Sequence, residues 1–286
     1  MPADRREDVL ISASALAGLL ASDQAPSVLA IRSPDTVCPR PFQAAPRIPG
    51  AQDAEMTVDF ASPSHPRDGA RPLPDVAALQ ETVRRLGLRK NRAIVVYDHD
   101  GNLMAARAWW VLRWAGFTRV VMLDGGFEAW ASAGCAVVTE ASPPPVPSDV
   151  AIQPGGMPEL DADSAARLAR SGVLLDTRIA PNYRGGDVPP GTPARGHIPG
   201  AINVPAPDTL TPDGHFADLA TLRSLYAATG ADGNRPVGVY CGAGVSAAHT
   251  VAALMMLGID APMYPGSWSA WSADPSRPVA TGPEPG

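Results

Sequence analysis

The sequence predicts an α/β protein built from two similar domains, each with a mainly parallel sheet flanked by helices. Short apolar runs alternate with helical patterns along the 286 residues, an order typical of parallel sheets that helices cover on both faces. Three sequence landmarks occur twice in the same order, which indicates an internal duplication. A proline-rich segment separates the two copies and can continue neither a helix nor a central strand.

The expected strands are short apolar runs. They lie at residues 28–31, 93–97 and 120–123 in the first copy and at residues 173–175 and 237–240 in the second. Helical patterns follow at residues 103–115 and 248–257, and a glycine ends each of them. The tryptophans at positions 109, 110 and 114 are expected to be core residues of the first of these helices and to lie at the domain interface. The stretches 32–75 and 179–219 lack such patterns and are expected to be long loops.

Three landmarks define the duplication. Each copy has an Ile-Pro-Gly-Ala segment, a strand that ends in tyrosine, and a segment with two aromatic residues three positions apart. In the first copy they lie at residues 48–51, 93–97 and 124–130, and in the second at residues 198–201, 237–240 and 265–271. A shared order and a nearly constant offset make a duplication far more probable than chance.

The two copies differ at the residue that follows the tyrosine. This residue is Asp98 in the first copy and Cys241 in the second. We therefore expect a catalytically inactive first domain over residues 1–140, a proline-rich linker over residues 141–158 and a catalytic second domain over residues 159–286. In this interpretation Asp98 stands in place of the nucleophile and takes no part in catalysis.

Cys241 is the predicted nucleophile because of the loop that surrounds it. A strand ends directly before it, and a glycine-containing loop leads from it into a helix. Backbone N–H groups at a helix N-terminus stabilise an anion, so a thiolate is favoured there. The residues expected to bind the sulfur are Gly242, Ala243, Gly244, Val245, Ser246 and Ala247. The alternative is a buried structural cysteine, which the glycines and the helix start make less probable.

Composition and charge exclude several classes of function. A net charge of −6 without any basic tract argues against nucleic-acid binding. No segment approaches the ~18 apolar residues of a membrane span, and the charged N-terminus does not resemble a signal peptide. Three widely spaced cysteines favour a reducing compartment and hence a cytoplasmic location. The spacing of histidines and cysteines matches no metal-binding motif, so no metal is expected.

These motifs resemble the tandem-domain rhodanese family of sulfurtransferases. The resemblance rests on the two Ile-Pro-Gly-Ala segments, the loop Tyr-Cys-Gly-x-Gly-Val-x-Ala and the segment Gly-Ser-Trp-x-x-Trp, and it covers residues 12–271. It implies two rhodanese-like domains and transfer of a sulfane sulfur through a persulfide on Cys241, without a cofactor. The implied partners are a small-molecule sulfur donor and an acceptor such as cyanide or a thiol, with thioredoxin as a possible thiol.

The loop is most similar to the 3-mercaptopyruvate sulfurtransferase branch, where it usually reads Cys-Gly-Ser-Gly-Val-Thr-Ala. The branch selective for thiosulfate typically has basic residues where this chain has Gly242 and Ala243. Their absence favours 3-mercaptopyruvate over thiosulfate as the donor. The same branch often has His-Met-Leu-Pro in the first domain, where this chain has Arg-Pro-Leu-Pro at residues 71–74.

The family also implies an arginine that holds the substrate, four residues beyond Arg178. Asn182 occupies that position here. Arg195 and Arg184 are therefore the substrate-binding candidates, Arg195 first, because an arginine can hold a carboxylate in a bidentate pair. Arg178 itself is expected to form a structural pair with Asp176.

The remaining polar residues receive structural predictions. His197 is expected to fix its loop through hydrogen bonds, and His249 to pack. Cys38 and Cys135 are expected to have no catalytic role, and a resolving thiol is the alternative for Cys38.

Two other functions stay open as alternatives to the sulfurtransferase. One is a module that binds or relays a persulfide without turnover of a small molecule. The other, less favoured, is a cysteine-based phosphatase or arsenate reductase, which needs the pattern Cys-x5-Arg. The position of that arginine is Ala247 in this chain.

Overall fold

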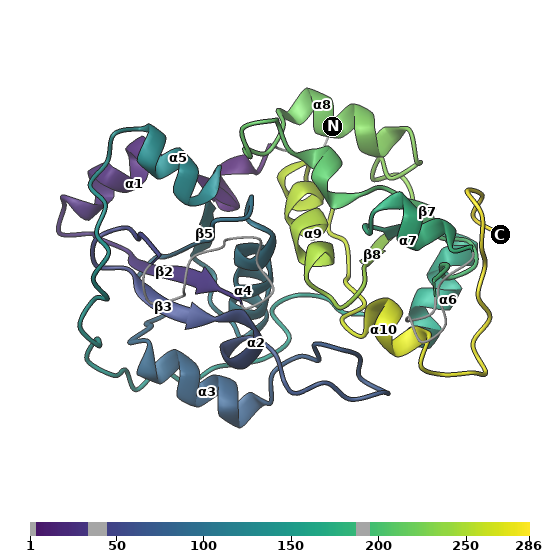
Figure 1. The fold of residues 1–286 in the computed structure, drawn as a ribbon, viewed down its shortest axis with the longest axis horizontal. Coiled ribbons are helices and arrows are strands. Elements are labelled where there is room, and N and C mark those ends of the chain that lie inside the picture. Colours follow the sequence, from purple (N-terminus) through teal and green to yellow (C-terminus); the bar gives the residue numbers. More distant parts are fainter. Residues whose placement is uncertain (1–3, 34–44, 187–194) are drawn as a thin grey trace.

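The computed structural model describes residues 4–33, 45–186 and 195–286 and shows two α/β domains side by side (Figure 1). All strand pairs within the two sheets are parallel. The first sheet has the order β1-β5-β4-β2-β3 and contains β1 (Leu10–Ile11), β2 (Ser27–Arg32), β3 (Gln52–Glu55), β4 (Ile94–Tyr97) and β5 (Val120–Leu123). The second has the order β7-β6-β8 and contains β6 (Val173–Asp176), β7 (Ile202–Asn203) and β8 (Val237–Tyr240).

Helices cover both faces of the first sheet. The described helices of this domain are η1 (Arg6–Asp8), α1 (Ala13–Leu20), α2 (Met56–Asp59), α3 (Val76–Arg85), α4 (Leu103–Trp114) and α5 (Gly126–Ser132). Alternate residues of β2 serve the two faces: Val28 and Ala30 pack in the cluster of α1 and α5, whereas Leu29 and Ile31 pack in the cluster of α3 and α4. The strand is apolar throughout because both faces are buried.

The second domain repeats this plan with a smaller described sheet. Its helices are α6 (Ala162–Ser171), α7 (Ala180–Arg184), η3 (Ala206–Thr209), α8 (Leu219–Ala227), α9 (Ser246–Met256) and α10 (Ser267–Trp271). The predicted duplication and fold class are therefore confirmed. All five predicted strands are present, and α9 begins two residues earlier than the helical pattern indicated.

The two predicted long loops are only partly correct. The first stretch contains β3 and α2, and the second contains α7, β7 and η3. These elements are short and their sequences are not apolar runs. The strand β3 forms because it pairs in parallel with β2, so a long-range contact rather than a local pattern creates it.

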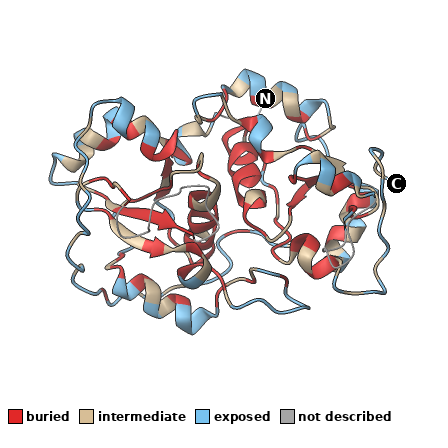
Figure 2. Cartoon of the chain, in the orientation of Figure 1, coloured by how far each residue is buried: buried red, intermediate tan, exposed pale blue. Residues whose placement is uncertain are grey.

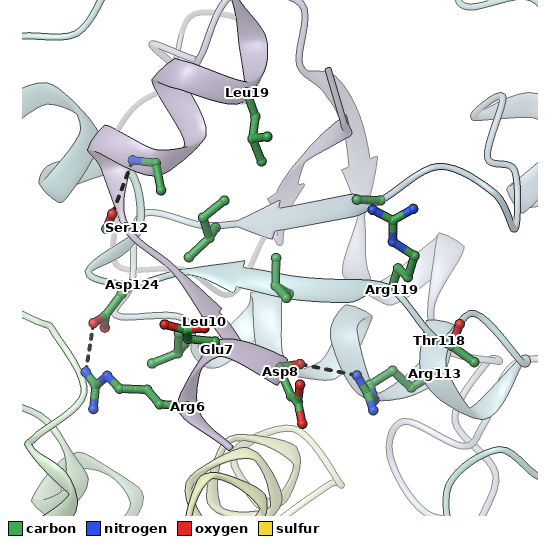
Figure 3. A pocket seen from close by; sticks show the side chains of 14 residues that line it. Arg6, Glu7, Asp8, Leu10, Ser12, Leu19, Arg113, Thr118, Arg119 and Asp124 are labelled. Carbon is green, nitrogen blue, oxygen red and sulfur yellow. Dashed lines mark hydrogen bonds and ion pairs between the residues drawn. The ribbon is translucent and has the colours of Figure 1, made fainter. Parts of the chain in front are cut away.

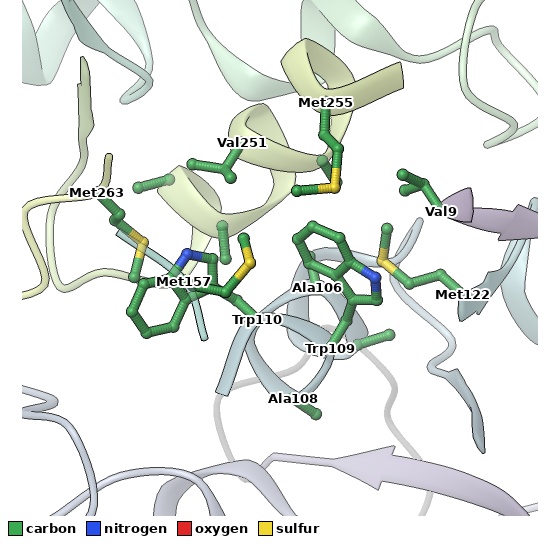
Figure 4. Packing of buried hydrophobic residues seen from close by; sticks show 14 of the residues in the cluster. Val9, Ala106, Ala108, Trp109, Trp110, Met122, Met157, Val251, Met255 and Met263 are labelled. Atoms are coloured by element: carbon green, nitrogen blue, oxygen red, sulfur yellow. The ribbon is translucent and has the colours of Figure 1, made fainter. Parts of the chain in front are cut away.

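Helices α4 and α9 pack against each other and join the two domains (Figure 1). Both are almost wholly buried (Figure 2). Trp109 and Trp110 of α4 lie in one hydrophobic cluster with Val251 and Met255 of α9 (Figure 4). The predicted interface role of these tryptophans is confirmed, and one continuous core serves both domains.

The proline-rich segment lies along α3 of the first domain rather than hanging free. The side-chain nitrogen of Gln80 donates to the carbonyl of Val150 at 2.6 Å, and the Ile152 N–H donates back to the Gln80 side chain at 3.0 Å. The Ser148 N–H donates to the carbonyl of Arg84 at 3.0 Å.

Within the described ranges, no helix has the length and apolar character needed to cross a membrane.

Candidate active site

Cys241 lies at the carboxyl end of β8, at the start of a loop of residues 241–247 that we name the sulfur loop. The residue is 1% exposed, and its Sγ accepts a hydrogen bond from the Gly244 N–H at 3.0 Å. Gly244 has a φ of +73°, and a Cβ atom there would lie 2.6 Å from the Pro265 carbonyl oxygen. Only glycine therefore fits this position, where the loop closes around the sulfur.

The sulfur loop carries further N–H donors. Helix α9 begins at Ser246, and the first N–H groups of a helix have no carbonyl of a preceding turn to bind. Among the residues that the structure describes, no acceptor takes a hydrogen bond from the N–H of Ala243, Val245 or Ser246. These donors, together with the positive end of the helix dipole, favour an anion in the loop.

Asp98 shows how the matching loop of the first domain holds an anion. The side chain is fully buried after β4, and its carboxylate accepts hydrogen bonds of 2.7–2.9 Å from the N–H groups of Asp100, Asn102, Met104 and Ala105. Burial raises the pKa of Asp98, and the N–H donors oppose that rise. Two of these donors, the N–H groups of Asp100 and Asn102, correspond to those of Ala243 and Val245, which have no acceptor among the described residues of the second domain.

Ser267 belongs to the site and was missed from the sequence. Its hydroxyl accepts a hydrogen bond from the Cys241 N–H at 3.2 Å, donates to the Tyr264 carbonyl at 2.9 Å and lies 3.8 Å from the Cys241 Sγ. Its φ of +51° is unusual for a residue with a side chain. The first copy has Gly126 at the matching position, with a φ of +60°. The sequence signal that could have indicated Ser267 is a serine at a repeat position where the first copy has a glycine.

Arg178 pairs with Asp176, as predicted. Its Nε donates to both carboxylate oxygens at 3.0 and 3.1 Å, and its Nη2 donates to Asp176 and to the Gly196 carbonyl. The guanidinium carbon lies 4.6 Å from the centroid of the Trp268 ring. A Cβ atom on Gly242 would lie 3.9 Å from the Arg178 Cδ, so this ion pair flanks the start of the sulfur loop.

Arg195 and Arg184 both lie on the surface. Arg184 ends α7, Arg195 directly precedes Gly196, and both residues are exposed. Within the described ranges, no hydrogen bond joins either side chain to the sulfur loop. Asn182 is half-buried beside them, and its carbonyl accepts a hydrogen bond from the Gly196 N–H at 3.2 Å. The roles assigned to both arginines stay predictions.

His197 fixes two loops, as expected. Its Nδ1 lies 2.9 Å from the Tyr183 carbonyl oxygen and its Nε2 lies 3.2 Å from the Pro285 carbonyl oxygen. The imidazole also stacks on the Tyr183 ring with centroids 3.8 Å apart.

The other candidates have structural surroundings. His249 is buried, stacks on Phe216 with centroids 4.2 Å apart, and has its pKa lowered to about 3 by burial. The Ser246 hydroxyl lies 3.0 Å from that of Thr177. Cys135 is half-buried against a core cluster of the first domain, and Cys38 lies outside the described residues. The described part of the chain contains no group of three or more histidine, cysteine, aspartate or glutamate residues able to hold a metal.

A loop of the first domain, residues 62–75, lies against the second domain near this site. The Ala70 N–H donates to the Ser269 hydroxyl at 2.9 Å, and a Cβ atom on Gly69 would lie 2.6 Å from the Gly266 carbonyl oxygen. A cavity of about 550 Å³ lies between this loop and the second domain, and its lining includes Leu73, Asp75, Glu159, Tyr264 and Gly266. Both domains therefore shape the surroundings of α10.

A separate cavity of about 750 Å³ lies at the edge of the first sheet, beside β1 and β5 (Figure 3). Two of its arginines already have partners: Arg6 pairs with Asp124 at 2.9 Å, and Arg113 donates to the Asp8 carbonyl at 3.4 Å. No residue of the sulfur loop lines it.

Comparison with known proteins identifies the family. The rhodanese-like domain matches twice, at residues 12–133 and 161–274. The chain belongs to the rhodanese family. The second match contains the sulfur loop, and the first contains Asp98, so the predicted resemblance is confirmed.

Several relatives of this rhodanese are named sulfurtransferases. It is 41% identical to the putative thiosulfate sulfurtransferase SseB of Mycobacterium tuberculosis over 291 residues, which cover 97% of this chain and 98% of the relative. It is 41% identical over 243 residues to the probable 3-mercaptopyruvate sulfurtransferase of Pseudomonas aeruginosa, covering 82% and 84% of the two chains. The sulfur carrier protein TtuD of Thermus thermophilus is 30% identical over 250 residues, covering 83% and 86%. The predicted enzyme class, a sulfurtransferase, is confirmed.

Solved structures share the fold at lower identity. YnjE matches with a TM-score of 0.82 and 24% identity, covering 96% of this chain and 68% of its own. Wild-type EanB matches with a TM-score of 0.84 and 21% identity, covering 99% and 71%. At these identities the likeness concerns the fold alone.

Proposed function

We propose that this sulfurtransferase carries its sulfane sulfur as a persulfide on Cys241. The observation that carries the proposal is the contrast between the two loops. In the first domain four N–H donors bind the Asp98 carboxylate, whereas in the second the sulfur of Cys241 takes one, from Gly244, and other donors of the loop stay available for a terminal sulfur anion.

The chemistry balances without a further reagent. The Cys241 thiolate attacks the transferable sulfur of the donor, which is the thiol sulfur of 3-mercaptopyruvate or the outer sulfur of thiosulfate, and forms an S–S bond. With 3-mercaptopyruvate the C–S bond breaks, and the carbon keeps the electron pair and takes a proton, which gives pyruvate. With thiosulfate the S–S bond breaks and sulfite leaves. A thiolate or cyanide then attacks the outer sulfur, and Cys241 leaves as the thiolate.

We propose 3-mercaptopyruvate as the better donor. Gly242 and Ala243 place no cation at the start of the sulfur loop for the sulfonate of thiosulfate, and Arg178 nearby is already paired with Asp176. A donor with a carboxylate needs a cation that binds this carboxylate farther from the Cys241 sulfur than the start of the sulfur loop. Arg195 and Arg184 are exposed and free to serve, with Arg195 the first choice. The names of the relatives include both donors, so kinetics must decide between them.

A second candidate function is a relay that hands the persulfide to a protein without turnover of a small donor. Asn182 in place of the usual substrate arginine favours it, as does the likeness to a relative named a sulfur carrier protein. For the sulfurtransferase itself, the proposed acceptors are thioredoxin, another protein thiol or cyanide, and we also propose a cytoplasmic location.

The phosphatase alternative gains no support, because the loop has Ala247 where that chemistry needs an arginine. The bounds 1–140, 141–158 and 159–286 for the two domains and their linker also stay proposals.

The test treats the purified chain with each donor separately and weighs its cysteine peptides. We expect one added sulfur on the Cys241 peptide, none after Cys241→Ser, and an unchanged result after the matched Cys135→Ser. Sulfur found only on another cysteine would contradict the proposal.

Steady-state kinetics with both donors test the substrate. We expect a higher kcat/KM for 3-mercaptopyruvate, and a fall of about 10- to 150-fold in Arg195→Ala, which corresponds to loss of roughly 1.5–3 kcal/mol from a charge-assisted pair. An Arg184→Ala variant serves as the comparison. A higher value for thiosulfate would leave only the general activity, and sulfur on Cys241 without turnover of either donor would favour the relay.

A further inference from the structure

A buried arginine of the first domain lies behind the sulfur loop. Arg107, on α4, is 0% exposed. Its Nη1 donates to the Gly244 carbonyl oxygen at 3.2 Å, across the domain interface. Its Nε donates to the Phe60 carbonyl oxygen at 3.2 Å. Its Nη2 donates to the carbonyl oxygens of Arg71 at 3.2 Å and Pro72 at 3.0 Å. One guanidinium thus ties together three segments of the first domain and the sulfur loop of the second.

All four acceptors of Arg107 are neutral carbonyl oxygens. No carboxylate lies within ion-pair distance of its guanidinium among the described residues. A buried charge without a counter-ion is costly, and buried arginines elsewhere in this domain have one: Arg47 pairs with Asp53 at 3.0 Å. The missing counter-ion of Arg107 therefore needs an explanation.

The group that can supply the negative charge is the sulfur of Cys241. The Arg107 Nη1 would lie 3.1 Å from a Cβ atom on Gly244, the residue whose N–H binds that sulfur. Burial lowers the pKa of Arg107 to about 10, and the charge of Cys241 opposes this shift, while the nearby Arg71 adds to it. The Arg107 guanidinium and the Cys241 sulfur both bind Gly244, at its carbonyl and its N–H respectively. A cation and an anion at this separation favour each other's charged forms.

We infer that Arg107 is a positioning residue of the sulfur loop, and that its charge stabilises the anionic sulfur of Cys241 from the domain that lacks the cysteine. The inference rests on the proposed persulfide chemistry. Arg107 is fully buried, so we assign it no contact with donor or acceptor. It holds Gly244 from behind and supplies a positive charge that water cannot screen, because the site is buried.

The test measures the rate at which iodoacetamide alkylates Cys241 across a pH series, in the full chain and without any donor. This rate follows the thiolate fraction and does not require sulfur transfer. In Arg107→Gln and Arg107→Met we expect the profile to move to higher pH by roughly one unit, equivalent to about tenfold slower alkylation near neutral pH. We expect kcat/KM to fall about tenfold or more.

Two further variants separate charge from folding. Arg107→Lys keeps the charge, so its pH profile should stay close to that of the parent although loop geometry changes. Arg47→Gln removes another buried arginine of the same domain, so it should lower stability and leave the profile unchanged. A folded Arg107→Gln or Arg107→Met protein with the parental profile would overturn the inference.

The result stays decisive if both neutral variants fail to fold. A folded Arg107→Lys protein whose profile moves up by a full unit would equally overturn the inference. Failure of the proposed function would look different: the parent would take up no sulfur on Cys241, whatever the alkylation profiles show.

Discussion

At the scale of residues, two positions separate the copies of the duplication. At the first position, the first copy has Asp98, whose buried carboxylate accepts four N–H hydrogen bonds. The second copy has Cys241, whose sulfur accepts one. At the second, Gly126 stands opposite Ser267, and both adopt a positive φ. The backbone geometry is thus shared, and the second copy uses it to place a hydroxyl beside the sulfur at the expense of backbone strain.

Ser267→Gly tests that hydroxyl without adding strain, because Gly126 shows that glycine suits this backbone. The variant removes the acceptor of the Cys241 N–H and the hydroxyl 3.8 Å from the sulfur. We expect kcat/KM to fall roughly tenfold, about 1.4 kcal/mol of transition-state stabilisation. Urea unfolding should show little loss of stability, since relief of the strained φ offsets the lost hydrogen bond. An unchanged kcat/KM would show that the hydroxyl only supports the fold.

At the scale of elements, the sulfur loop depends on one glycine at the junction of β8 and α9. Gly244→Ala places a Cβ atom 2.6 Å from a carbonyl oxygen, whereas Gly50, with a φ of +79°, has open space around the added atom. Gly50→Ala should cost about 1–2 kcal/mol of unfolding free energy from φ alone. Gly244→Ala should cost more and also suppress persulfide formation, measured by mass. Equal effects of the two substitutions on stability and activity would contradict the steric argument.

Helix α9 also carries His249, whose pKa of about 3 makes stability depend on pH. The folded chain keeps this imidazole neutral down to about pH 3, whereas the unfolded chain binds a proton below about pH 6.5. Stability is therefore lost as the pH falls below about 6.5, by at most about 1.4 kcal/mol per pH unit from this group. Urea unfolding between pH 5 and 7 should show a shallower dependence in His249→Gln. His65→Gln, at an exposed histidine, is the control and should match the parent.

At the scale of the whole molecule, one hydrophobic core spans both domains through α4 and α9. We therefore expect a single unfolding transition, with tryptophan fluorescence and far-ultraviolet circular dichroism coincident. Val251→Asn places an amide in the buried interface and should lower the unfolding free energy by roughly 2–4 kcal/mol while keeping one transition. Val58→Asn, at a residue 68% exposed, should change it by less than about 0.5 kcal/mol. Two separated transitions would mean that the domains unfold independently.

The sequence by itself determined the α/β class, the duplication and the place of Cys241 between a strand and a helix. These properties depend on local apolar runs, on glycines and on the repeat, all of which are visible within a few residues of one another. The tertiary structure decided the rest. The contact of Ser267 with Cys241 spans 26 positions, and that of Arg107 with Gly244 spans 137. Short strands such as β3 and the exposure of Arg195 likewise depend on packing between distant segments, and no local pattern encodes them.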